Sequence, residues 1–62
     1  MTGNELVKLL EKNGWVVARI KGSHYIMKKE GERATLSIPV HTGTEIKPGL
    51  LNFILKTASL KR

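Results

Sequence analysis

The sequence predicts an α+β fold in which two helices cover one face of a three-stranded antiparallel sheet. An apolar stripe at helical spacing opens the chain, alternating apolar residues fill its middle, and a second helical stripe closes it. Packing both helices on one face of the sheet is the simplest way to bury these surfaces. A chain of 62 residues has room for one small core, so we expect a single domain over residues 1–62.

A capping box predicts the start of the first helix. Thr2 and Glu5 stand three residues apart before an apolar run, so each side chain can bond to the backbone N–H of the other residue. Gly14 can take the left-handed conformation that ends a helix. We therefore expect a helix over residues 3–13, with Trp15 packed back on its last turn. The apolar stripe of this helix comprises Leu6, Val7, Leu9 and Leu10.

From Trp15 the apolar period changes to two, which predicts strands. Gly22-Ser23 lies between two alternating runs and predicts a two-residue hairpin loop, and residues 30–33 predict another turn. Pro39 has no N–H to donate, so its strand should lie at an edge or end there. The face expected beneath the helices carries Val16, Ala18, Ile20, Tyr25, Met27, Leu36, Ile38 and Val40. The opposite set comprises Trp15, Val17, Arg19, Lys21, His24, Ile26 and Lys28, and its face is expected to carry Arg19, Lys21, His24 and Lys28 towards solvent.

The last part of the chain predicts a loop and a second helix. Residues 41–44 read as a loop, and Pro48 suits the first turn of a helix, where its missing N–H is harmless. The second apolar stripe consists of Leu50, Leu51, Ile54, Leu55 and Ala58.

Composition restricts the classes of function. The chain carries 11 Lys and Arg against 5 Asp and Glu, for a formal charge of +6, and it has no cysteine. So basic a small protein attracts polyanions, which makes nucleic acid the first partner class; an acidic protein or a merely solvated basic surface are the alternatives. No disulfide framework or thiolate metal site is possible. No apolar run is long enough to cross a bilayer and no signal peptide is evident, so we expect a cytoplasmic protein.

The hairpin loop predicts a candidate site. A two-residue loop makes Lys21 and His24 directly opposed, with Cβ atoms roughly 4.5–5.5 Å apart on one face. An imidazole beside fixed positive charge suits acid–base chemistry on a phosphodiester. The alternative is a histidine that only binds phosphate or occupies a turn. No carboxylate cluster accompanies the two histidines, so we expect no metal and no cofactor.

Several motifs resemble those of the HicA toxins, mRNA interferases of toxin–antitoxin modules. They are Asn13-Gly14-Trp15, Lys21-Gly22-Ser23-His24, Ser37-Ile38-Pro39-Val40-His41 and Lys47-Pro48-Gly49. The resemblance covers nearly the whole chain and implies one HicA-like toxin domain with a fold like double-stranded RNA-binding domains. Leu50-Leu51-Asn52 departs from the family pattern, because it lacks a hydroxyl and a basic residue at the start of the last helix.

The resemblance also implies a function. It implies endonucleolytic cleavage of RNA, with His24 as the catalytic residue and a HicB-type antitoxin covering the active surface. We expect the toxin alone to be monomeric. We expect Lys21, Arg19 and Lys28 to bind the RNA phosphates, with Gly22 and Ser23 offering backbone N–H groups. His41 is an open candidate for a second catalytic group. The competing hypotheses are a non-catalytic RNA-binding module of the same fold and a DNA-binding or ribosomal accessory domain.

Overall fold

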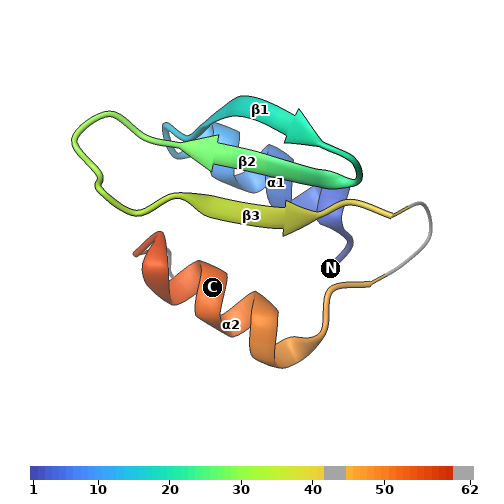
Figure 1. Ribbon diagram of the computed structural model, residues 1–62. Coiled ribbons are helices and arrows are strands. Elements are labelled where there is room, and N and C mark those ends of the chain that lie inside the picture. The colour runs from blue at the N-terminus through green and yellow to red at the C-terminus, as the bar shows by residue number, and fades with distance from the viewer. Residues whose placement is uncertain (42–44, 60–62) are drawn as a thin grey trace.

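The computed structural model describes residues 1–41 and 45–59 and confirms the predicted order of elements (Figure 1). The three strands form one antiparallel sheet in the order β1-β2-β3. Helix α1 lies behind this sheet in Figure 1, and α2 runs along the β3 side. The elements are α1 (Gly3–Lys12), β1 (Val16–Lys21), β2 (His24–Lys28), β3 (Leu36–Pro39) and α2 (Pro48–Thr57).

The capping box at the start of α1 forms as predicted. The Thr2 N–H donates to Glu5 Oε1 at 2.9 Å, and the Glu5 N–H donates to Thr2 Oγ1 at 3.3 Å. Hydrogen bonds that the Glu5 carboxylate accepts from the backbone and the side chain of Thr2 hold the pKa of Glu5 below its ordinary value. The helix ends at Lys12, one residue earlier than predicted, and Gly14 has the expected positive φ of 94°.

One hydrophobic core joins both helices to the inner face of the sheet. Trp15 is its largest side chain and is only 1% exposed. The alternation that placed Trp15 in the outward-facing set is therefore wrong at this position, whereas its cluster with Leu6 and Leu10 agrees with the prediction that it packs back on the first helix. No charged side chain of the described residues is buried. The core consists of Leu6, Val7, Leu10, Trp15, Met27, Leu36, Ile38, Ile46, Leu51, Ile54, Leu55 and Ala58.

The predicted faces of β1 are wrong in its first half. Val17 pairs with Met27, while Arg19 pairs with Ile26, so Ala18 is an extra residue in a β-bulge. The bulge breaks the alternation, and Val17 therefore packs against the core while Val16 is 59% exposed.

The two other residues expected beneath the helices on β1 are exposed as well. Ala18 is exposed as the extra residue of the bulge. Ile20 pairs with Tyr25 on the expected face but is 57% exposed, because β1 is an edge strand. The core face of the sheet is thus narrower than the sequence predicted, and β2 and β3 supply most of it.

The other sheet predictions hold. The Glu32 N–H donates to the Lys29 carbonyl at 3.0 Å and forms the expected turn before β3. Pro39 is the last residue of β3, which is an edge strand, so both expectations for this proline are met. The loop predicted over residues 41–44 falls mainly on residues 42–44, which lie outside the described residues.

Gly3 lets α1 approach the end of β3 closely. A Cβ atom added at this position would meet the Pro39 carbonyl oxygen and would lie 2.9 Å from the Val40 Cα. These are backbone atoms, which cannot move aside as a flexible side chain can. The first turn of α1 therefore supports the segment on which β3 ends.

Candidate functional site

The β1–β2 hairpin places the candidate catalytic histidine. Lys21 and His24 are Cα partners across the Gly22-Ser23 loop, as predicted. Gly22 has a φ of 60°, a left-handed value that suits a short hairpin loop and that other residues adopt at a cost. His24 thus begins β2 at the tip of the hairpin, where its direction is fixed by the strand.

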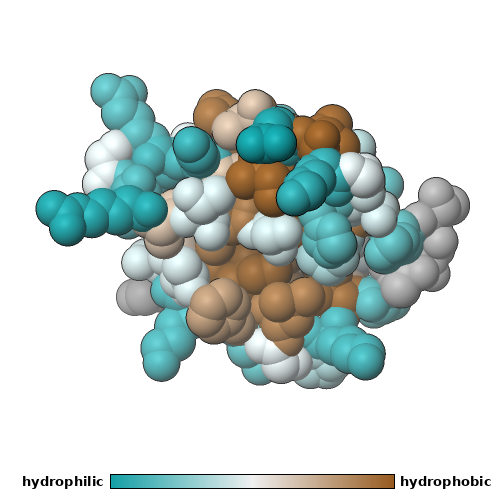
Figure 2. Space-filling model, in the orientation of Figure 1, coloured by the Kyte–Doolittle hydropathy of each residue, from teal (hydrophilic) through white to brown (hydrophobic). Residues whose placement is uncertain are grey.

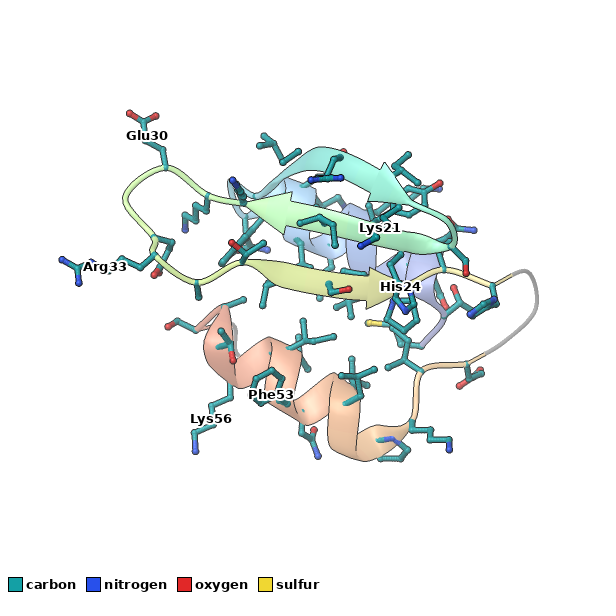
Figure 3. All side chains as sticks on the ribbon, in the orientation of Figure 1. Lys21, His24, Glu30, Arg33, Phe53 and Lys56 are labelled. Carbon is teal, nitrogen blue, oxygen red and sulfur yellow. The ribbon has the colours of Figure 1, made fainter. Side chains whose placement is uncertain are left out.

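Four predicted site residues share the outer face of the sheet. His24 and Lys28 lie on the side of β2 that faces away from buried Met27. On β1, Lys21 pairs with His24, and Arg19 pairs with Ile26, which lies between His24 and Lys28. All four are exposed. We call Arg19, Lys21, His24 and Lys28 the cationic face. Figure 3 shows Lys21 and His24 beside each other at one end of the sheet.

The end of β3 holds the hairpin loop in place. Pro39 is the Cα partner of His24, and the Val40 N–H donates to the Ser23 carbonyl at 2.7 Å. Gly22 is exposed and Ser23 is half-buried. Ser23 therefore has an evident structural role, while the anion-binding role expected of the two residues stays a prediction.

His41 follows closely after the partner of His24. It is exposed, and together with Pro39 it lines a hollow beyond the end of β3. The structure therefore brings the two histidines to the same end of the sheet, although 16 residues, Tyr25 to Val40, separate them in the chain. Sequence spacing alone gave no sign of this proximity.

This arrangement can bind and act on a phosphodiester. An exposed imidazole can exchange protons with a ligand, and neighbouring ammonium and guanidinium groups can hold a phosphate. Within residues 1–41 and 45–59 there is no group of three or more His, Asp or Glu side chains that could hold a metal ion. Among the described residues, this face offers the His24 imidazole, the cations and the hydroxyl of exposed Ser37, which pairs with Ile26.

Two features of the surface were missed by the sequence interpretation. Phe53 was assigned no role, yet it is 63% exposed on α2 (Figure 3). Glu45, Ile46 and Lys47 lie beside the end of β3 and line the same hollow as His41. The Lys47-Pro48-Gly49 motif was interpreted only as a helix start, and no local pattern points to a cavity there.

The fold and the cationic face define a small basic α+β protein with a ligand-accessible histidine. Residues 3–60 match the family described as HicA toxin of bacterial toxin-antitoxin. The match spans nearly the whole chain, so this chain belongs to the HicA toxin family and is the toxin of a toxin–antitoxin module. Membership implies an antitoxin partner. No curated protein matches the chain. Neither helix in the described part of the chain is long and apolar enough to span a membrane.

Proposed function

We propose that this toxin is an endoribonuclease that cleaves mRNA and inhibits translation and growth until an antitoxin binds it. The observation that carries the proposal is the exposed imidazole of His24, directly opposite Lys21 on the cationic face. The formal charge of +6 draws the phosphates of RNA towards the molecule. Membership in a toxin family supports a damaging activity of this kind.

The proposed reaction uses the ribose of the substrate. A base takes the proton of the 2′-hydroxyl, O2′ attacks phosphorus, and the 5′ oxygen leaves with a proton from an acid. The products are a 2′,3′-cyclic phosphate and a 5′-hydroxyl end. His24 serves as the general acid or base, and Lys21 stabilises the negative charge that develops on the phosphoryl oxygens. Arg19, Lys28 and the backbone N–H groups of Gly22 and Ser23 bind the flanking phosphates.

Cleavage of RNA in the presence of EDTA tests the proposal. The parent is expected to cleave without added metal, whereas His24→Ala should be slower by roughly 10²–10⁴-fold, the usual contribution of acid–base catalysis. His24 is exposed, so the free energy of unfolding should not change. Asn4→Ala, at an exposed position of α1 behind the sheet, is the matched control and should keep the parent rate.

The same assay separates the proposal from a non-catalytic RNA-binding module. Retention of RNA by both the parent and His24→Ala, without cleavage by either, would show that the cationic face only binds. A substrate with 2′-deoxyribose at the cleaved position should resist the parent, because it lacks the nucleophile. Cleavage of that substrate would rule out a reaction in which the 2′-hydroxyl is the nucleophile.

His41 is the candidate for the second proton-transfer group. If it acts in the reaction, His41→Ala should lower the maximal rate and should alter one limb of the pH–rate profile. If it only contacts the ligand, the variant should raise the substrate concentration needed for half-maximal rate and leave the profile unchanged.

The antitoxin is proposed to be HicB-like and to cover the cationic face. An exposed basic surface favours a partner that presents acidic side chains, and such contacts weaken as salt increases. Copurification with the product of a neighbouring reading frame, tested at low and high salt, would support this. A complex in which His24 stays accessible to RNA would contradict it.

A further inference from the structure

A hollow of about 220 Å³ lies between the end of β3 and the start of α2. All of its lining residues come from one stretch of the chain, between Pro39 and Leu50. The residues lining it are Pro39, His41, Glu45, Ile46, Lys47 and Leu50. Figure 2 shows hydrophobic surface, in brown, extending from the β3 side of the sheet onto α2. The hollow is smaller than the roughly 300–1,000 Å³ of a pocket for a drug-sized ligand, which suits a single ring system.

The hollow is continuous with the cationic face. Pro39 is one of its walls and is also the Cα partner of His24. The Val40 N–H bond to the Ser23 carbonyl fixes the same stretch of chain against the hairpin loop. A ligand whose phosphate lies beside His24 and Lys21 therefore has this hollow as its immediate neighbour.

The lining combines a flat apolar wall with a polar rim. Pro39, Ile46 and Leu50 offer aliphatic surface against which a planar ring can pack. Glu45 offers a carboxylate, of which Oε2 already accepts from the N-terminal ammonium of Met1 at 3.0 Å. Lys47 offers an ammonium donor and His41 an imidazole. A planar heterocycle with donors and acceptors on its edge matches both parts of this lining, whereas a simple aliphatic side chain would leave the polar rim unused.

We infer that this hollow binds a nucleobase of the RNA, from a nucleotide next to the cleaved phosphate. The position of that base relative to the chemistry rests on the proposed function. The hollow adjoins the cationic face at Pro39, the partner of His24, and a strand whose phosphates lie on that face must place its bases beside it. The hollow would thus give the toxin a preference for the base at one position of its substrate.

Titration of the isotopically labelled chain with the four nucleoside 5′-monophosphates, followed by NMR, tests the inference without needing cleavage. Ribose 5-phosphate is the matched probe that lacks a base. At least one nucleotide should shift the backbone amides of Ile46, Lys47 and Leu50, and ribose 5-phosphate should not. Equal shifts from both probes, or no shifts in these amides, would overturn the inference.

A pair of tryptophan substitutions on α2 sharpens the test. Leu50 lines the hollow and is 39% exposed, so Leu50→Trp fills the space without entering the core. It should weaken nucleotide binding about tenfold or more, the scale of a lost base contact. Phe53→Trp, three residues further on the same helix and outside the lining, should bind as the parent does. Equal binding by Leu50→Trp and Phe53→Trp would overturn the inference.

The outcomes distinguish this inference from the proposed function. If nucleotides shift these amides but the protein cleaves no RNA, the base site is supported and the nuclease proposal is contradicted. If the protein cleaves RNA but the amide shifts do not depend on the base, the nuclease proposal is supported and the base site is contradicted. Weaker capture of the antitoxin by Leu50→Trp, with no base-dependent shifts in the parent, would assign the hollow to the protein partner and overturn the inference.

Discussion

The two ends of the β1–β2 hairpin differ in the regularity of their strand pairing. At the tip, Lys21 and His24 pair directly across a two-residue loop, and the side chains alternate as an ideal ladder requires. At the other end, the extra residue Ala18 shifts the register, and Val17 rather than Val16 reaches the core. The tip carries the proposed chemistry, whereas the bulged end joins the sheet to the core beside Trp15.

This difference shows how one small hairpin separates two tasks. Burial at the bulged end stabilises the fold, and Lys28 is the residue of the cationic face that pairs there, with Val16. The tip contributes little to the core, so its side chains are free to contact a ligand. Substitutions at the two ends should therefore affect different measurements, the free energy of unfolding at one and the rate of RNA cleavage at the other.

The largest expected effect is at the bulged end. Trp15→Ala removes the largest buried side chain and should cost about 3–5 kcal/mol of the free energy of unfolding. A chain of this length has only about 3–9 kcal/mol in total. Chemical denaturation should show a variant that is largely unfolded at room temperature. A variant that stays as stable as the parent would contradict the role assigned to this end.

Gly22→Ala should disturb the tip while leaving the core intact. The new Cβ would meet no atom within 4 Å, but the positive φ would strain the loop by about 1–2 kcal/mol. Cleavage should slow because His24 and Lys21 are moved. Gly49→Ala is the matched control, since it lies in α2 with open space and should slightly stabilise the helix. Equal effects of the two variants on the rate would contradict the prediction.

A matched valine pair tests the bulge. Val17→Ala should lower the free energy of unfolding by about 1 kcal/mol more than Val16→Ala, because only Val17 packs against the core. Both variants lose the same intrinsic strand preference, so the difference reports burial. Equal values from the two urea melts would show that the ladder runs without the bulge.

The smallest expected effect compares the two lysines of the cationic face. Lys21 pairs with His24 at the tip, whereas Lys28 pairs with Val16 at the bulged end. Lys21→Met should slow cleavage several-fold, while Lys28→Met should mainly weaken RNA binding. Each should reduce the slope of the logarithm of affinity against the logarithm of salt by about one. If Lys28→Met slowed cleavage more than Lys21→Met, the proposed position of the reaction at the hairpin tip would be contradicted.

The sequence predicted those parts of the fold that depend on local rules. The capping box of Thr2 and Glu5, the two-residue loop and the helix start at Pro48 are each set by neighbouring residues, and each forms. The bulge was not predictable, because Val16, Val17 and Ala18 are all apolar and any register places an apolar residue inside. Apolar alternation cannot fix the register of a strand that carries apolar residues on both of its faces.

The candidate site divides in the same way. The pairing of His24 with Lys21 follows from loop length, and their exposure follows from the alternation of the second strand. The hollow beside them was not predictable, because Pro39, Ile46 and Leu50 meet only after α2 docks. Its existence is a consequence of tertiary packing.

The hydrogen bond between the Val40 amide and the Ser23 carbonyl has a practical consequence. Its proton should exchange with deuterium only when the segment after β3 detaches from the hairpin loop. If it exchanges faster than the amides paired within β2, the end of the sheet that carries His24 opens by itself while the remaining sheet stays folded. The proposed site would then be lost in brief local openings, at temperatures well below global melting.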